Sequence, residues 1–335
     1  MFPRRYFFVL LLGLMLFGMS TGAHVPLGVE GNTNLKTAFS IDDPSKTYAI
    51  YGILENTGDM AYFRFFLKAG DRLDLTLMNA GPVNPVPDMV ILSPGISAMH
   101  KNVSAFNEIP AGYNAVIVNG HAPPPAEYEP FTPAAIYKVA SYSSLVQTPG
   151  IYYVAIVSNE NDTHYSFAPG YNEEFSPSEW VLVPVSTIIT HTWEGQPILT
   201  VLAPFIAVFI LGIIVIARRE HRKGSRTGMV FWLATLAGLL YLGGAALTLV
   251  QMLRVLQITG PQPLAIVTLI FAAVPAVLGI IALRLSRRPT PLSLRDRISL
   301  CTIAGLGFVF WAGLIIGPVC VMIAALIPDS IQHNS

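Results

Sequence analysis

Long apolar stretches alternate with short polar junctions over the C-terminal part of the chain. Each stretch holds 20 or more residues, and an α-helix of about that length crosses the ~30 Å hydrocarbon core of a bilayer. The pattern therefore predicts an all-α bundle of four transmembrane helices, followed by a short tail at residues 328–335. The four predicted helices cover residues 198–217, 228–250, 264–285 and 298–327.

Ahead of these stretches the apolar positions recur with a period of two, which is typical of half-buried β-strands. Leu73, Leu75 and Leu77 alternate with Asp74 and Thr76, so we expect the leucines to point into a core. Turn residues such as Gly, Pro, Asn and Asp separate further short segments rich in β-branched and aromatic residues. These segments cover residues 48–54, 62–67, 89–92, 115–118, 151–157 and 165–167.

Short strands without a long amphipathic helix predict an all-β domain, a jelly roll or other β-sandwich, over residues 24–175. A membrane-proximal linker is expected at residues 176–197, with one more strand near residues 180–185. Trp180 and Trp193 lie close to the first apolar stretch, where tryptophan is common at the level of the lipid headgroups. The fold class is thus an extracytoplasmic β-sandwich followed by a four-helix transmembrane bundle.

The N-terminus has the order of residues found in secretory signals. Arg4 and Arg5 precede an apolar run from Tyr6 to Met19, and small residues then lead to Ala23. Residues 1–23 are therefore predicted to be a signal peptide, cleaved after Ala23 or retained as an anchor. Both alternatives place the following domain outside the cell membrane.

Basic residues predict the orientation of the apolar stretches. The junctions after the first and third stretches carry ten Lys and Arg residues together, whereas Arg254 alone lies between the second and third. An excess of Lys and Arg in short loops marks the cytoplasmic side. The sequence therefore predicts a multi-pass protein of the cell membrane, with the large N-terminal domain and the C-terminal tail both outside.

The formal net charge of zero hides an acidic exterior domain. Residues 24–197 hold 17 acidic and 7 basic residues, a difference of 7 − 17 = −10. Such a domain repels nucleic acid and anionic membrane surfaces. The expected partners follow instead from the apolar stretches: the lipid bilayer and an unidentified second membrane protein. Cys301 and Cys320 are the two cysteines, and both lie in the last apolar stretch. The exterior domain therefore folds without a disulfide.

Four segments of the exterior domain resemble the pre-peptidase C-terminal domain family: residues 59–65, 69–75, 87–95 and 149–156. The resemblance extends over about residues 47–167. Domains of that family are small extracellular jelly-roll sandwiches, usually appended to secreted proteases, that bind polymers or assist folding. The resemblance implies the same fold here, but no protease domain accompanies it. Residues 101–146 are also longer than the connection usual in the family.

Two kinds of metal site are open to the exterior domain. Cleavage after Ala23 would leave His24 as the first residue, and its amine and imidazole could chelate copper with help from His100, His121 or His164. That site would make the protein a copper enzyme. Loop carboxylates offer oxygen ligands for calcium, although aspartate is also a common turn former; they are Asp42, Asp43, Asp59, Asp71, Asp74 and Asp88.

Two further patterns concern glycosylation and helix packing. Asn102 and Asn161 each open an Asn-x-Ser/Thr acceptor sequence on the predicted outer side. Small residues four apart allow helices to approach closely, either among the four predicted spans or against another protein. The pairs considered are Ala203 with Ala207, Ala234 with Gly238, Ala272 with Ala276, and Gly313 with Gly317.

Catalytic motifs are missing from the sequence. It contains no Gly-x-Ser-x-Gly, no His-Glu-x-x-His and no phosphate-binding glycine loop, and its predicted spans are almost free of the ionisable residues that transporters use. We therefore expect no enzymatic activity and no cofactor. The leading hypothesis is a surface protein whose exterior sandwich binds a polymer, a glycan or a partner protein. The alternative is a non-catalytic accessory subunit of a membrane enzyme or transport complex.

Overall fold

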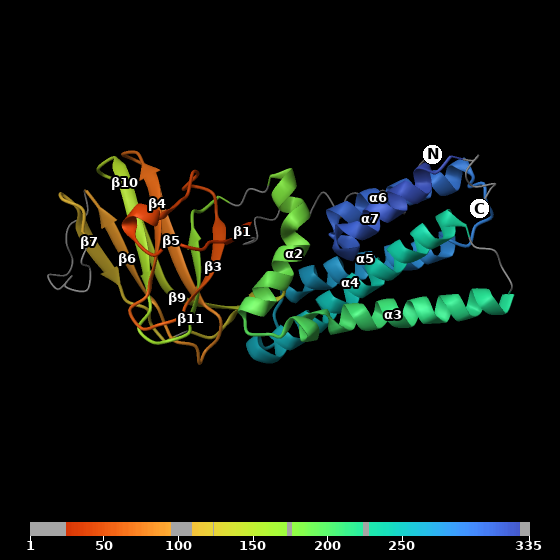
Figure 1. Ribbon diagram of the computed structural model, residues 1–335, viewed down its shortest axis with the longest axis horizontal. Helices are drawn as coiled ribbons and strands as arrows, with labels where there is room; N and C mark the ends of the chain where they lie inside the picture. Colours follow the sequence, from red (N-terminus) through yellow and green to blue (C-terminus); the bar gives the residue numbers. More distant parts are fainter. Residues whose placement is uncertain (1–24, 95–108, 123, 173–175, 224–227, 329–335) are drawn as a thin grey trace.

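The computed structural model describes residues 25–94, 109–122, 124–172, 176–223 and 228–328. Figure 1 shows a β-sandwich at one end of the molecule and a set of long helices at the other, with helix α2 (Pro177–Trp193) between them. The predicted order, a β domain followed by a helical part, is confirmed.

Two sheets form the sandwich. The first has six strands in the order β1 (Val25–Gly28), β3 (Tyr48–Leu54), β11 (Thr163–Pro169), β5 (Arg72–Asn79), β9 (Ala134–Leu145) and β8 (Glu127–Glu129). The second has five, in the order β2 (Phe39–Ser40), β4 (Met60–Leu67), β10 (Gly150–Val157), β6 (Asp88–Ser93) and β7 (Asn114–Val118). A short 3-10 helix, η1 (Leu35–Thr37), precedes β2.

Alternation along β5 builds the core between the sheets. Leu73, Leu75 and Leu77 are at most 2% exposed, whereas Asp74 and Thr76 are half-buried on the other face of the strand. The predicted inward direction of the leucines is therefore confirmed. Apolar side chains of both sheets meet in this layer, where the rings of Phe63 and Phe167 lie 4.8 Å apart.

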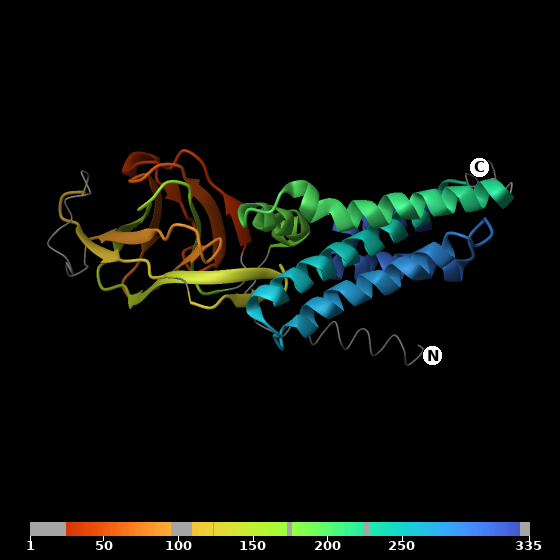
Figure 2. The same ribbon diagram turned by 90° about the horizontal axis from the view of Figure 1, so that it is seen from below.

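Three helices are long and apolar enough to cross a membrane: α3 (Ile198–Lys223), α4 (Met229–Thr259) and α5 (Ala265–Leu285). They lie side by side in Figures 1 and 2, and α4 packs between the others. A β-carbon added to Gly238 of α4 would lie 2.9 Å from the carbonyl oxygen of Gly279 in α5. Glycine thus permits close contact between these two helices.

The predicted single helix over residues 298–327 is wrong. Helices α6 (Leu294–Val309) and α7 (Ile316–Leu326) are bent by 118° about the 3-10 turn η2 (Ala312–Ile315). Arg297, at the start of α6, donates hydrogen bonds from Nη1 to the carbonyl oxygens of Ala325 and Ile327, at 2.6 and 2.8 Å. The two helices form a hairpin, so the end of α7 lies beside the start of α6.

The backbone at the tip explains the reversal. Trp311, Leu314 and Ile315 have φ of 49°, 56° and 66°, and Gly313 has φ of 61°. Left-handed residues end an α-helix because they break its hydrogen-bond ladder. A β-carbon on Gly313 would lie 2.9 Å from the side chains of both Leu240 and Tyr241, so the tip packs against the middle of α4.

The strand predicted near residues 180–185 is wrong, because helix α2 (Pro177–Trp193) occupies most of the segment between the sandwich and α3. Ser176 accepts a hydrogen bond from the Glu179 backbone N–H, and the Glu179 carboxylate accepts one from the Ser176 backbone N–H. This reciprocal cap, with proline at the first helical position, starts the helix and outweighs the strand preference of its valines. The strand expected near residues 180–185 does not form.

The hairpin changes where the C-terminus is expected. Ile327 lies beside Arg297, which belongs to a junction predicted to be cytoplasmic. We therefore expect Pro328, the last residue described, to lie on the cytoplasmic side, contrary to the external tail predicted from four spans. In intact cells, Pro328→Cys should resist an impermeant thiol reagent as fully as Ser293→Cys does, and Val83→Cys, 91% exposed in the sandwich, should react.

Labelling of the unsubstituted protein measures the background reaction of its two native cysteines, Cys301 and Cys320. Both substituted positions should react once the membrane is permeabilised. Labelling of position 328 but not of position 293 in intact cells would show that the chain crosses the membrane at α6 and α7, and the hairpin topology would be refuted.

Candidate binding site at the base of the sandwich

The strands β8 and β9 attach the sandwich to the end of α4 and the start of α5. Tyr128 and Tyr137 pack with Met252 and Val255 of α4 in one buried cluster. The Thr268 hydroxyl of α5 donates to the carbonyl oxygen of Pro130 at 2.6 Å. Its oxygen therefore accepts the hydrogen bond from the Tyr128 hydroxyl at 2.7 Å. Figure 2 shows β9 extending to these helix ends.

Glu194, directly after α2, joins three parts of the chain. Its carboxylate accepts hydrogen bonds from the backbone N–H of Ala135 in β9 at 3.3 Å and from Nδ1 of His191 in α2 at 3.0 Å. It also accepts from Nε2 of Gln196 at 3.1 Å. Gln196 in turn accepts from Gln251 of α4 at 3.0 Å. Because Glu194 is only 10% exposed, these bonds replace the water that its charge would otherwise require.

Aromatic side chains connect the sandwich and α2 to the hairpin tip. The rings of Trp180 in α2 and Trp311 at the tip lie 4.5 Å apart, and the indole N–H of Trp180 donates to the carbonyl oxygen of Phe308. Phe131, between β8 and β9, lies 5.3 Å from Phe271 of α5 and 6.2 Å from Trp311. The tip therefore touches both exterior elements.

An ion pair secures the other end of α2. Lys46 of the sandwich lies 2.6 Å from the Glu179 carboxylate, and both side chains are at most 24% exposed. Burial alone would raise the pKa of Glu179, but the bonds from Lys46 and Ser176 hold it below its ordinary value. Glu179 is therefore charged at neutral pH and holds the sandwich against α2.

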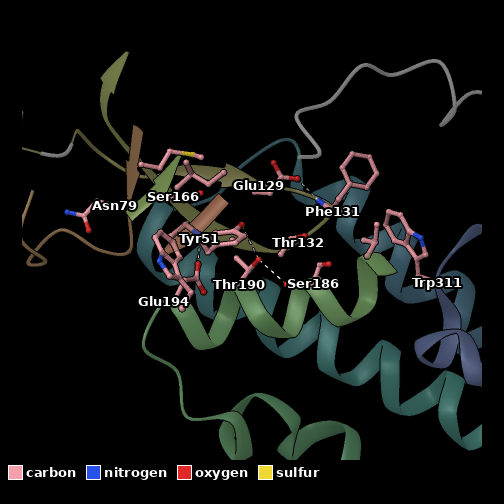
Figure 3. A pocket seen from close by; sticks show the side chains of 16 residues that line it. Tyr51, Asn79, Glu129, Phe131, Thr132, Ser166, Ser186, Thr190, Glu194 and Trp311 are labelled. Carbon is pink, nitrogen blue, oxygen red and sulfur yellow. Dashed lines mark hydrogen bonds between the residues drawn. The ribbon is translucent and has the colours of Figure 1, made fainter. Parts of the chain in front are cut away.

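A pocket lies where the sandwich, α2 and the hairpin tip meet (Figure 3). The space between its walls measures about 720 Å³ when the open solvent at its mouth is counted. Its polar and aromatic walls come from β3, β5, β8, β11, α2, the loop after β8 and the hairpin tip: Tyr51, Asn79, Glu129, Phe131, Thr132, Ser166, Ser186, Thr190, Trp193, Glu194 and Trp311.

The pocket is acidic, and several of its lining polar groups are buried. Glu129 and Glu194 line it, and none of its lining residues is Lys, Arg or His. Burial raises the pKa of Tyr51 to about 12, although its hydroxyl accepts a hydrogen bond from Thr190 at 3.1 Å. Ser166 Oγ is buried and has no hydrogen-bond partner among the described residues. Such a site can attract a cation and offer it polar and aromatic contacts.

The histidines proposed for copper are placed only in part, since His24 and His100 lie outside the described residues. His121 is exposed at the end of β7, and His164 forms a 3.0 Å hydrogen bond through Nδ1 with the carbonyl oxygen of Trp193. His164 thereby fixes the end of α2. Within the described ranges, no three metal-binding side chains of His, Cys, Asp or Glu come together.

Carboxylates considered for calcium take part in turns. Asp43 accepts from the Ser45 backbone N–H, Asp59 from that of Asn56, and Asp71 from that of Lys68. Asp88 accepts from Gly120 and Asn159. The bonds of Asp43, Asp59 and Asp71 fix local turns, whereas those of Asp88 join segments far apart in the sequence. Asp74 instead pairs with Arg72 at 2.6 Å.

The glycosylation candidates are also placed in part. Asn102 lies outside the described residues, whereas Asn161 is exposed in the turn before β11. The Oδ1 atom of Asn161 accepts hydrogen bonds from the backbone N–H and the hydroxyl of Thr57, at 2.9 and 3.1 Å. This uses the oxygen of the side-chain amide, while glycosylation acts on its nitrogen, so the acceptor at Asn161 stays a prediction.

Small residues proposed for helix packing lie at two contacts within the chain. Gly238 faces α5, and Ala234 is fully buried one turn away on α4. Gly313 and Gly317 both face Tyr241, where a β-carbon on Gly317 would lie 2.3 Å from the ring. Gly313 belongs to the turn and Gly317 to α7, so this pair does not form the face of one helix.

Comparisons with known proteins add little to this geometry. No family model matches the chain, and no curated protein matches its sequence. Among solved structures, the pre-peptidase C-terminal domain of a collagenase from Bacillus anthracis matches at 16% identity, covering 39% of this chain and 92% of that domain, with a TM-score of 0.21. The assignment of a two-sheet sandwich rests on the strand pairing.

Loss of the Glu194 charge should loosen the sandwich from the helices. In the native protein the two carboxylate oxygens of Glu194 accept hydrogen bonds from three donors. In Glu194→Gln a single amide oxygen remains as the acceptor, and the new amide N–H group points at donors with which it cannot bond. An unmet buried hydrogen bond costs about 1–3 kcal/mol. We expect a lower unfolding temperature for the full-length protein in mild detergent, measured by intrinsic tryptophan fluorescence.

Glu127→Gln is the matched control. Glu127 lies in β8, next to the strand that Glu194 contacts, but it is 60% exposed and pairs with the exposed Lys138, and such pairs contribute about 0–1 kcal/mol. Its unfolding temperature should stay near that of the unsubstituted protein. An equal decrease of the unfolding temperature in the two variants would show that Glu194 contributes no more than an exposed glutamate to the docking of the sandwich on the helices.

Proposed function

We propose that the protein is a multi-pass membrane protein without catalytic activity, whose exterior sandwich is a binding module. The pocket at the base of the sandwich is its binding site. The observation that carries this proposal is that three separate parts of the chain, the sandwich, α2 and the hairpin tip, supply the walls. A ligand there would contact the exterior domain and the membrane helices at once.

The charge distribution supports an exterior sandwich. The ends of α3 and α5 and the start of α6 carry the basic residues, and all lie at the end of the helices remote from the sandwich (Figure 1). Lys and Arg concentrate on the cytoplasmic side of membrane proteins. The sandwich and its pocket then face the outside, where a secreted or surface ligand is available.

The lengths of the helices support the same placement. Helix α4 has 31 residues and spans ~46 Å at ~1.5 Å per residue, which exceeds the ~30 Å of hydrocarbon. Its outer turns carry Gln251 and Arg254 and meet β9. Helix α2 crosses the direction of the spans and exposes Val181, Val185 and Ile189 at intervals of four residues, as a helix does when it lies in a membrane surface.

The shape of the pocket favours a small ligand or the end of a longer one. Aromatic and polar groups line a partly enclosed space, which is typical of sites for small molecules. Among the ligand classes predicted from the sequence, a terminal group of a polymer or glycan fits this space better than a flat protein surface does.

An accessory subunit is the second candidate, favoured by the surroundings of α3. Only 6% of the apolar 18-residue stretch of α3 is buried inside the structure. Its exposed apolar residues include Ile206, Ile210 and Leu211. That surface is available to lipid or to the span of another protein. In this case the catalytic or transport activity belongs to the partner protein, and the pocket belongs to its accessory subunit.

Native mass spectrometry of the full-length protein, purified in mild detergent, tests the proposal. We expect a bound small molecule on the unsubstituted protein. The molecule should be missing from Ser186→Phe, since this substitution puts a large ring into the pocket from α2. Val185→Phe is the control, because Val185 is 52% exposed beside it on the same helix and does not line the pocket.

Other results would decide against the pocket. A stoichiometric partner protein in place of a small molecule would favour the accessory subunit. A small molecule retained equally by Ser186→Phe and Val185→Phe would place the binding site elsewhere in the protein.

A further inference from the structure

We propose that the pocket binds a protonated amine, either the ammonium headgroup of a lipid or a free organic amine. This inference rests on the proposed function of the pocket as a binding site and names the chemical class of its ligand. It follows from the charge of the pocket, its aromatic walls and its buried polar groups, which are independent of one another.

The charge of the pocket selects a cation. Among the described residues that line it, Glu129 and Glu194 are acidic and none is basic. On α2, His191 donates to the Glu194 carboxylate through Nδ1. Arg254 lines a second pocket, which Glu194 also lines. An anion would meet two carboxylates in a partly desolvated space, where charge repulsion is strong.

The aromatic walls favour an organic cation over a metal ion. Tyr51 and Trp193 have ring centroids 4.9 Å apart at one end of the pocket, and Phe131 and Trp311 lie 6.2 Å apart at the other. Ammonium groups are attracted to the faces of such rings. Calcium instead requires six to eight oxygen ligands, and the described residues contain no group of three metal-binding side chains.

Two buried oxygens among the lining residues favour an amine that carries N–H groups over a quaternary one, whereas the Trp311 indole N–H, also without a hydrogen-bond partner among the described residues, can donate only to another group of the ligand. Asn79 Oδ1 and Ser166 Oγ belong to lining residues that are each 1% exposed, and neither atom has a hydrogen-bond partner in the described part of the chain. A primary ammonium has three donors, enough to reach a carboxylate and one of these acceptors. A tetraalkylammonium ion has none.

Thermal unfolding of the full-length protein in mild detergent tests the inference with ethanolamine and putrescine as probes. Tetramethylammonium and potassium chlorides at equal ionic strength are the comparisons. We expect both amines to raise the unfolding temperature in a saturable way, and tetramethylammonium to act no more strongly than potassium. Glu129→Gln should weaken the apparent affinity for the amines about tenfold or more, because a hydrogen bond to a charged group is lost. Glu127→Gln should leave it unchanged.

A second arm separates the two sources of the amine. The protein is placed in nanodiscs of phosphatidylethanolamine or of phosphatidylglycerol, and its unfolding temperature is compared between them. Stabilisation by phosphatidylethanolamine that depends on Glu129, without a response to soluble amines, would identify a lipid headgroup. The opposite pattern would identify a free amine. Either result supports the inference.

The inference is overturned if neither arm shows stabilisation beyond that of potassium, or if Glu129→Gln responds as Glu127→Gln does. Unfolding of each variant without ligand shows whether it is folded. The proposed function is tested separately from the identity of the ligand. If a molecule bound to the protein is displaced by Ser186→Phe while amines have no effect, the pocket is a binding site for another class of ligand.

Discussion

The charge of Glu194 is the constraint on which the arrangement of the molecule depends. A carboxylate that is 10% exposed must be paired or it destabilises the fold. Its partners come from β9, α2 and the loop that leads to α3, and through Gln196 it reaches Gln251 of α4. Tilting the sandwich away from the helices would break these bonds together. The exterior domain is therefore held in one orientation.

That orientation also determines the pocket and the hairpin tip. Because the sandwich is fixed, Phe131 is held near Phe271 and Trp311. The tip contains three residues other than glycine in the left-handed region, a conformation that persists only where surrounding contacts favour it. Contacts of Trp311 with Trp180 and Phe131 are among those that do so. A ligand in the pocket would therefore touch a part of the membrane domain whose conformation depends on its neighbours.

Sequence patterns predicted elements whose periodicity is local. It predicts the inward leucines of β5 and the three long apolar helices, because burial of alternate residues or of whole segments is visible as a pattern of apolar residues in the sequence. Helix α2 was missed since Val181, Val183 and Val185 resemble a strand, although Ser176, Pro177 and Glu179 form the signature of a helix start. That signature was the available signal. The hairpin was missed because hydropathy records apolar length and does not record a change of direction at Gly313.

The pocket could not be predicted, because its parts are brought together only by the fold. Tyr51, Glu129, Glu194 and Trp311 are far apart in the sequence, and no motif links them. Residues 101–146 are longer than the connection usual in the resembled family, but the role of this segment in docking Tyr128 and Pro130 on α5 depends on where the helices lie.

Disulfide formation between Thr132→Cys in the sandwich and Thr187→Cys in α2 tests most directly whether the exterior domain is fixed on the helices. The two hydroxyl oxygens lie 3.5 Å apart, so the cysteines should link almost completely in the folded full-length protein under mild oxidation. The unfolding temperature in detergent should not fall. Thr132→Cys with Ser178→Cys, at the far end of α2, should remain unlinked. Equal linkage of both pairs, or linkage of the first only after unfolding, would contradict a docked domain.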